Sequence, residues 1–403
     1  MSKPQHPYVL ATAAVSSLVL ARDAQARSVA PNYWTWSSAA HETMVETLRS
    51  LESANIRALL SSVEENPRSS VACRRLVDAL VPLMGAGGSS AAAARLVEAA
   101  QDVECLSRLL VHFGNGSDLS REVLDGAAGA ETLLNGIARL PHGGSHAVDA
   151  AVVIPFRATL QGQDRVVNLA AVLNALSHQT YPREKYRIIV VESDSEPRWQ
   201  QLFSRYCDRY LFAPCSGPFN KSWTVNVGVV HGARPTELVC IIDGDILVDH
   251  DFISRNVQRF QEAGTQAHWP YRDLLCLDEW ASERARQRRC LEAAARVSTD
   301  DLRGVYMRRS PGACIWVRES LFTRIGGMDE RFAGWGGEDE DFAWRVERHA
   351  PLDSYRDVLA HLHHGRAPHK AESGVAFYDD KEKFSFCSWP CDSVIGQIDR
   401  FTR

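Results

Sequence analysis

Residues 238–245, LVCIIDGD, decide the fold, because an apolar run ends there in an acidic turn. Five consecutive apolar residues are typical of a strand that is buried on both faces of a parallel sheet. Open α/β sheets place their binding sites at the carboxyl ends of such strands. Asp243, Gly244 and Asp245 are therefore predicted to lie at a binding edge, although an isolated Asp-x-Asp is more often a solvated turn.

The segments around this strand alternate between strand and helix patterns. Short apolar runs predict further strands at 150–155, 187–191 and 210–213, and helices are predicted at 165–176 and 222–231. This alternation predicts the α/β class, with a doubly wound, mostly parallel sheet and flanking helices.

The first 146 residues have a different pattern. Apolar side chains recur at three- and four-residue steps over 47–63, 72–84 and 91–111, which predicts amphipathic helices. We therefore expect an all-α N-terminal domain (1–146) of unknown role, then the sheet domain (147–370). Residues 371–403 are expected to form a C-terminal tail that packs on the sheet domain.

Composition excludes some classes of protein. The 403 residues carry a net charge of -5, which gives no reason to expect nucleic-acid binding. The apolar run 8–21 is too short to span a membrane, so no integral membrane span is expected. This run is either a signal peptide cleaved near residues 24–26 or a buried first helix. The scattered cysteines fit reduced thiols, and the expected location is the cytoplasm.

A second acidic cluster follows the sequence Trp335-Gly336-Gly337. Four acids at 338–341 fit the first turn of a helix, where negative charge is favourable. The two glycines would leave room for a ring to stack on the tryptophan. A carboxylate beside that platform, from Glu338 or Asp339, could accept a proton from a hydroxyl group.

The sequence HLHH at 361–364 could supply metal ligands. Neutral imidazole is a common ligand for transition metals, and His361 and His364, three residues apart, can face the same side of a turn. His363 should point away. Such clusters are more often solvent-facing, but the acidic triplet offers a metal site for them to join.

Taken together, these segments resemble the glycosyltransferases of the GT-A fold. The likeness is to the β-1,4-galactosyltransferase group, bacterial chondroitin-type polymerases and polypeptide N-acetylgalactosaminyltransferases, and it covers roughly residues 148–370. The matching segments are IPFR at 154–157, FNKSWTVNVG at 219–228, DGD at 243–245, GGMDERFAGWGGEDED at 326–341 and HLHH at 361–364.

The resemblance implies a donor site for a uridine diphosphate sugar. Pro155, Phe156 and Arg157 would line the uridine and phosphate pocket, with Glu192 near the nucleoside. The implied donor-binding set is completed by Lys221, Asp243, Gly244, Asp245, Trp335, Gly336 and Gly337.

The resemblance also implies a metal and a base. Mn²⁺ or Mg²⁺ would be bound by Asp243, Asp245, His361 and His364, and which histidine is the main ligand stays open. Asp339 matches the general base of inverting members, and Glu338 would bind acceptor hydroxyls.

The implied reaction is metal-dependent transfer of a hexose or N-acetylhexosamine from a UDP-sugar to a hydroxyl of a glycan, peptide or small molecule. The retaining N-acetylgalactosaminyltransferases have Asn where this chain has Asp339, which favours inversion. The galactosyltransferases have Asp-Val-Asp where this chain has Asp-Gly-Asp, which leaves the metal role intact. The helical domain could mediate a homodimer.

Two alternatives were weighed against this reaction. A sugar-phosphate nucleotidyltransferase uses a related sheet and metal, but the segment 155–163 lacks the Gly-rich basic loop usual after the first strand. A catalytically silent GT-A domain, serving as a scaffold or carbohydrate-binding module, would have no need of Asp243, Asp245, Asp339 and His364 together.

Overall fold

The computed structural model describes residues 6–85, 90–114, 127–137, 147–160, 162–296, 298–334, 336–365 and 385–402. The chain forms two compact units, each treated by itself below. The helical unit comprises Met1–Ala127, Asp273–Ala285 and Val297–Arg309, and the sheet unit comprises Ala128–Arg272, Arg286–Arg296 and Ser310–Arg403.

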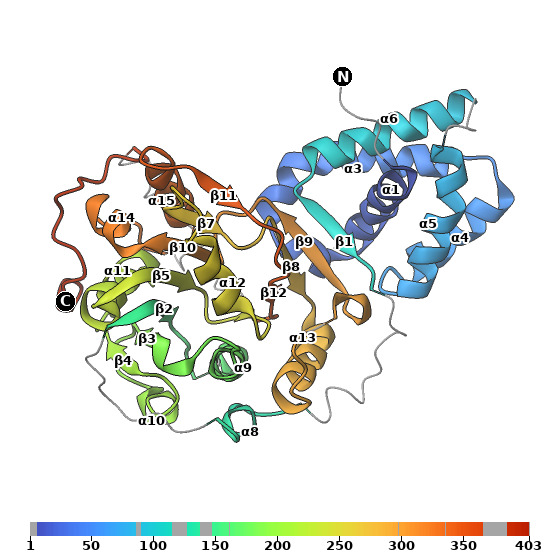
Figure 1. The fold of residues 1–403 in the computed structure, drawn as a ribbon. Coiled ribbons are helices and arrows are strands. Elements are labelled where there is room, and N and C mark those ends of the chain that lie inside the picture. Colours follow the sequence, from blue (N-terminus) through green and yellow to red (C-terminus); the bar gives the residue numbers. More distant parts are fainter. Residues whose placement is uncertain are drawn as a thin grey trace. The chain divides into compact units, whose positions relative to one another are not determined.

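The sheet unit is built on seven strands in the order β11-β7-β10-β5-β2-β3-β4 (Figure 1). Strands β5, β2, β3 and β4 are parallel, and β10 joins β5 antiparallel. The strands are β2 Val148–Phe156, β3 Tyr186–Glu192, β4 Arg209–Phe212, β5 Thr236–Ile242, β7 Ala267–Trp269, β10 Cys314–Arg318 and β11 Leu352–Ser354. The predicted α/β class and mostly parallel sheet are confirmed.

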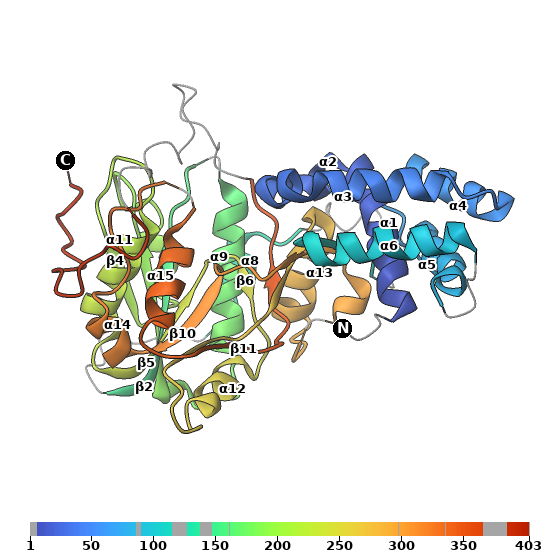
Figure 2. The same ribbon diagram turned by 90° about the horizontal axis from the view of Figure 1, so that it is seen from above.

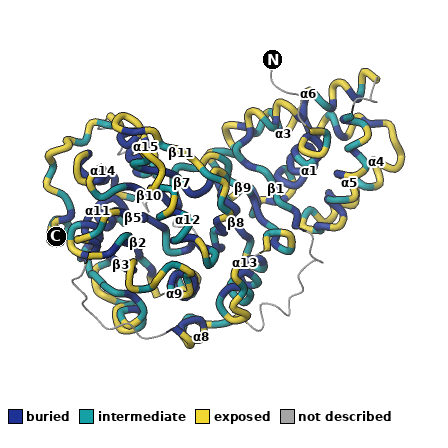
Figure 3. The backbone as a smooth tube through the Cα atoms, in the orientation of Figure 1, coloured by how far each residue is buried: buried dark blue, intermediate teal, exposed yellow. Residues whose placement is uncertain are grey.

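Helices cover both faces of this sheet. Val153 of β2 and Ile241 of β5 belong to one buried cluster with apolar residues of α11, α14 and α15. Helix α9 lies on the other face (Figure 2). The central strands are almost entirely buried (Figure 3), which explains why they read as continuous apolar runs. The helices are α8 Ala130–Leu134, α9 Gln163–Ser177, α10 Gln200–Phe203, α11 Lys221–Val227, α12 Phe252–Arg259, α14 Glu319–Arg324 and α15 Glu338–Glu347.

The segment FNKSWTVNVG forms α11 and joins a π-helix, Gly228–Ala233. Gly228 allows this helix to lie directly on the sheet, since a Cβ there would be 2.5 Å from Val153 Cγ1. The same helix anchors the described C-terminal segment, 385–402. Trp223 Nε1 donates to the Gln397 carbonyl at 2.8 Å, so this tail packs on the sheet unit.

The helical unit surrounds a buried first helix. Its elements are α1 Pro7–Arg22, α2 Ala24–Ser28, α3 Pro31–Arg49, α4 Ala54–Glu65, α5 Ser70–Met84, α6 Ala91–Leu106, β1 Leu109–His112, β8 Asp273–Leu277, α13 Glu279–Arg286 (which ends one residue beyond this unit) and β9 Gly304–Arg308. Most of α1 is buried. The run 8–21 thus forms a buried helix in this structure.

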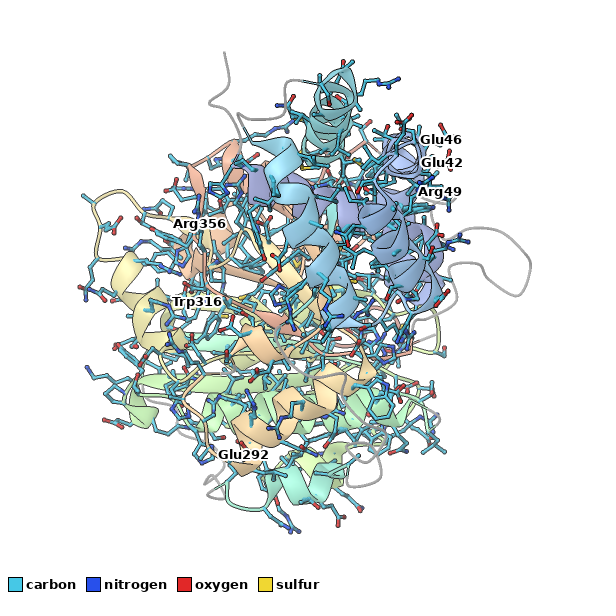
Figure 4. The ribbon with its side chains drawn as sticks, turned by 90° about the vertical axis from the view of Figure 1, so that its right-hand side faces the viewer. Glu42, Glu46, Arg49, Glu292, Trp316 and Arg356 are labelled. Atoms are coloured by element: carbon cyan, nitrogen blue, oxygen red, sulfur yellow. The ribbon has the colours of Figure 1, made fainter. Side chains whose placement is uncertain are left out.

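Helix α3 shows the amphipathic pattern plainly. Met44 and Leu48 lie in the core, whereas Glu42, Glu46 and Arg49 lie on the exposed side (Figure 4). Four-residue spacing therefore separates a core stripe from a charged stripe.

Two helix boundaries in this unit differ from prediction. The predicted helix 47–63 is two helices, because α3 ends at Arg49 and the Ser53 hydroxyl caps α4 by accepting from Ile56 N. The predicted helix 91–111 ends at Leu106.

Strand β1 follows that helix and pairs antiparallel with β9, which pairs with β8. In its described residues the helical unit's N-terminal part is thus helical apart from β1, and the strands that pair with β1 and β9 come from 273–308. Among the described residues, no helix combines the length and apolarity needed to cross a membrane.

Candidate metal centre and catalytic carboxylates

A short antiparallel pairing brings the acidic triplet next to the histidines. Strand β6, Ile246–Leu247, follows the triplet and pairs with β12, Ala360–His361, so that His361 lies opposite Ile246. Leu362 N donates to the Asp245 carbonyl at 2.8 Å, which extends this pairing. This pairing brings together the acidic triplet and the histidine segment, which are about 115 residues apart in the sequence.

Asp245, His361 and His364 form a group with metal-ligand geometry. One ligand atom of each lies within 4.8 Å of the others. Asp245 Oδ2 is 3.1 Å from His364 Nε2, and Asp245 Oδ1 is 3.6 Å from His361 Nε2. The predicted pairing of His361 and His364 on one side is therefore present, and His363 is not part of the group.

The carboxylate of this group suits a cation. Asp245 is buried, and its Oδ1 makes no hydrogen bond within the described residues. Burial raises the pKa of Asp245, but His361 and His364 outweigh that effect, and the net direction is downward. A buried, ionised carboxylate beside two imidazoles is a donor set that fits a divalent transition metal.

Backbone contacts hold the histidine segment in place. Asn168 Nδ2 of α9 donates to the His363 carbonyl at 3.0 Å, and Arg286 donates to Asn168 Oδ1 at 2.8 Å. His364 Nδ1 lies 2.9 Å from the Gly365 carbonyl. A hydrogen bond at one ring nitrogen leaves the other, Nε2, directed at Asp245.

Asp243 lies in a different environment, although only Gly244 separates it from Asp245. The Lys221 ammonium is 2.8 Å from Asp243 Oδ1 and 3.0 Å from Asp339 Oδ2. The side chain of Lys221 is only 10% exposed. The structure therefore joins a triplet carboxylate and the predicted base through one buried cation, and Asp243 is outside the metal-type group.

Burial and neighbouring charges shift both partners of this ion pair. Burial lowers the pKa of Lys221, but Asp243 and Asp339 more than compensate, so the net direction is upward. Burial raises the pKa of Asp339, Lys221 lowers it, and Glu338 and Asp243 raise it, so that the net pKa is about 7. A carboxylate with a pKa near neutrality is suited to general base catalysis.

The carboxylate of Asp339 also lies close to the backbone of Gly312. A Cβ at Gly312 would lie 2.6 Å from Asp339 Oδ2, so only glycine leaves the carboxylate in this place. Gly336 and Gly337 have φ values of 94° and 88°, a region that favours glycine. Gly337 caps α15, which begins at Glu338.

The four acids at 338–341 have different roles. Asp341 is fully buried and is bound by Arg345 at 2.8 Å and by Cys387 N at 2.6 Å, so it supports the fold. Glu338 is also buried, but its Oε2 makes no hydrogen bond within the described residues. Glu340 is exposed.

The predicted donor-site residues at the ends of β2 and β3 are buried or already form hydrogen bonds with other parts of the protein. Pro155 and Phe156 are buried. Arg157 donates to the Gly217 and Cys215 carbonyls at 2.7 Å. Glu192 accepts from Tyr210 Oη at 2.7 Å and from two backbone N–H groups, and burial raises its pKa. Trp335 lies outside the described residues.

Sequence reasoning missed two positions of this site. Gly312 lies against the carboxylate of Asp339, and Asn168 holds the histidine segment. Neither carries a signal in the sequence, because one glycine after Pro311 reads as an ordinary turn and one asparagine within an apolar helix reads as an incidental polar residue. Lys221 was predicted only as a donor-site residue, and its bridge between two carboxylates appears in the structure alone.

Comparison with known proteins supports the predicted resemblance. A family model for the N-terminal domain of galactosyltransferase matches residues 306–355. This range contains Glu338 and Asp339, so the resemblance of this segment to glycosyltransferases is confirmed. No curated protein matches the chain by sequence.

Several solved structures are similar. Staphylococcus aureus TarS (residues 1–349) matches with 12% identity and a TM-score of 0.40, over 53% of this chain and 60% of that one. The catalytic domain of Drosophila β1,4-galactosyltransferase 7, in complex with xylobiose, matches with 16% identity and a TM-score of 0.37, over 61% and 84%. A Pyrobaculum calidifontis mannosyltransferase with GDP-Man and Mn²⁺ matches with 16% identity and a TM-score of 0.37, over 59% and 63%. The chain thus covers less than two thirds of the TarS structure.

Proposed function

We propose that this protein is a metal-dependent, inverting glycosyltransferase that moves a hexose or N-acetylhexosamine from a UDP-sugar to an acceptor hydroxyl. One observation carries the proposal: the turn Asp243-Gly244-Asp245 contributes to a metal-type group and is connected, through the buried Lys221, to the carboxylate of Asp339. Asp245 faces His361 and His364, and Asp243 shares Lys221 with Asp339. A leaving-group site and a base are the two parts that this reaction needs.

The metal group fits the leaving side of the reaction. A divalent cation such as Mn²⁺, held by Asp245, His361 and His364, would supply Lewis acidity for the negative charge that develops on the departing diphosphate. The protein's part is to hold an ionised carboxylate and two neutral imidazoles in place. The buried Asp245 Oδ1, which makes no hydrogen bond among the described residues, and the contacts that hold the histidine segment support that role.

Asp339 would act on the accepting side. Its carboxylate takes the proton of the acceptor hydroxyl as the oxygen attacks the anomeric carbon from the face opposite the leaving group. A pKa of about 7 lets the carboxylate be ionised near neutral pH while keeping useful basicity. The carboxylic acid formed then loses its proton to solvent.

Glu338 would bind the acceptor. A buried carboxylate oxygen without a hydrogen-bond donor is costly, and Glu338 Oε2 is such an atom among the described residues. A hydroxyl of the acceptor, next to the one that reacts, would satisfy it. The acceptor can be a glycan, a peptide or a small molecule.

The experiment that tests this function is calorimetric titration of UDP into the purified protein, first with Mn²⁺ and then with EDTA. We expect binding with the metal and none with the chelator. UDP-galactose, UDP-N-acetylgalactosamine, UDP-glucose and UDP-N-acetylglucosamine are then screened for release of UDP. Absence of UDP binding in both conditions, with an intact thermal transition, would reject the proposal.

A further inference from the structure

Lys221 is shared between two carboxylates that have different tasks in the proposed reaction. Its ammonium has three N–H donors, and two are directed at Asp243 Oδ1 and Asp339 Oδ2, at 2.8 and 3.0 Å. Asp243 belongs to the triplet beside the metal group, and Asp339 is the proposed base. One buried cation thus serves both the leaving side and the accepting side.

The ion pair restrains the base in the donor-free protein. Asp339 Oδ2 lies 3.0 Å from the Lys221 ammonium and would be 2.6 Å from a Cβ at Gly312, so both neighbours restrict its movement. An ammonium at 3.0 Å occupies a lone pair of the carboxylate and lowers its affinity for a proton. Both effects oppose the transfer of a proton to that oxygen.

A bound diphosphate would compete for the same ammonium. The donor brings several negative charges to the edge where Asp243 lies, and ammonium–phosphate contacts are strong, charge-assisted hydrogen bonds. Lys221 is anchored at the first position of α11, while its Nζ lies at the end of a flexible four-carbon chain. A change of side-chain torsions suffices to move it from one partner toward another.

We infer that Lys221 is a positioning residue for which Asp339 and the donor's diphosphate compete, so that donor binding and release of the base are one event. The inference rests on the proposed function and deepens it, because it couples two parts of the site that the reaction by itself leaves independent. The coupling must be reciprocal. Loss of the Asp339 carboxylate should therefore strengthen donor binding.

The test is a double-mutant cycle on binding of UDP in the presence of Mn²⁺, measured by calorimetry. We expect Asp339→Asn to bind UDP about five- to tenfold more tightly than the wild type, within the usual range of coupling between sites. Asp339→Ala removes every side-chain oxygen at position 339, although Asp243 still contacts the ammonium. This variant should show the same gain in UDP affinity or a larger one. In a Lys221→Met background the gain should disappear, and in a Lys221→Arg background it should persist.

Two controls separate this effect from general electrostatics and from misfolding. Glu340→Gln removes an exposed acid from the same helical turn, and it should change UDP affinity less than twofold, a shift expected for a screened surface charge. Thermal melts report whether each variant is folded. If Lys221→Met does not fold, the arginine variant and the two Asp339 variants still decide the question.

The outcomes distinguish the inference from the function on which it rests. Wild-type protein that binds UDP with Mn²⁺, together with unchanged or weaker binding by both Asp339 variants, overturns the inference alone. A gain that survives in Lys221→Met also overturns it. Wild-type protein that does not bind UDP rejects the proposed function first.

Discussion

Asp243 and Asp245 are two residues apart in one turn, yet they belong to different chemical environments. Asp245 faces two imidazoles at 3.1 and 3.6 Å, and Asp243 faces the Lys221 ammonium at 2.8 Å. The difference arises from the element that each side chain meets: β12 brings the histidines to one, and α11 brings the lysine to the other. The two carboxylates of this Asp-x-Asp sequence therefore differ in what they can bind. Asp245 is suited to a metal ion, whereas Asp243 is already paired with the lysine ammonium.

This comparison separates the residues of the candidate site into a metal side and a base side. The metal side contains Asp245, His361 and His364, and the base side contains Lys221 and Asp339 with Asp243. Loss of the Asp339 carboxylate should abolish most of the turnover without abolishing metal-dependent UDP binding, which the competition for Lys221 should make tighter.

The largest effect is expected for Asp339→Asn. The amide cannot take a proton from the acceptor, so the turnover number for sugar transfer should fall by about 10²–10⁴-fold, the usual contribution of a general base. The measurement is UDP release from the active UDP-sugar with an acceptor present. Mn²⁺-dependent binding of UDP should be retained. Full transfer activity in this variant would show that Asp339 is not the base.

A smaller loss is expected for Gly312→Ala. The new Cβ would stand 2.6 Å from Asp339 Oδ2, so the carboxylate must shift, and a displacement of about 1 Å in a catalytic group costs on the order of 100-fold in rate. The variant should bind UDP with Mn²⁺ as the wild type does.

Gly264→Ala is a control for Gly312→Ala. Gly264 has a positive φ of 91° and open space around the added Cβ, so it tests backbone strain away from the site. Equal rates for Gly312→Ala and the wild type would contradict the confinement of Asp339.

The smallest effect is a pH dependence. Because the pKa of Asp339 is raised to about 7, the carboxylate is protonated and inactive below that pH and ionised above it. At saturating Mn²⁺, kcat/KM for the UDP-sugar should rise about tenfold between pH 6 and pH 8, since this parameter reports the pKa of the free enzyme. Lys221, Glu338 and Asp243 are the charged groups that set this pKa.

Measuring Mn²⁺ saturation at every pH separates this titration from protonation of the metal-side histidines. In the Asp339→Asn variant, the residual kcat/KM should not rise between pH 6 and pH 8. A flat profile in the wild type would place the proton acceptor elsewhere.

Much of the sheet unit could be predicted because its signals are local. Buried parallel strands read as apolar runs, and the runs at 150–155, 187–191, 210–213 and 238–242 match β2, β3, β4 and β5. The helix predicted at 165–176 matches α9. The proximity of His361 and His364 could also be predicted from the sequence, since residues three apart in a turn can face the same side.

The helical unit shows where local reasoning fails. Strand β1 follows a helix directly and has an ordinary four-residue sequence, LLVH. Its extended conformation depends on β9, nearly 200 residues (~195) further along the chain. A pattern of 3.6-residue steps that ends in three apolar residues, 109–111, cannot reveal a distant strand partner, so the predicted helix 91–111 is too long.

The α/β class, the positions of the parallel strands along the chain and the residue types of the candidate site could all be inferred from the amino-acid sequence, because apolar periodicity and turn residues act over a few positions. Which carboxylate meets which partner depends on the three-dimensional packing. Lys221, Asp243, Gly312 and Asp339 come from four separate segments, and their contacts depend on side-chain packing between α11, β5 and α15. Local sequence signals cannot carry that information, since charge neutralisation inside a protein depends on distance in space.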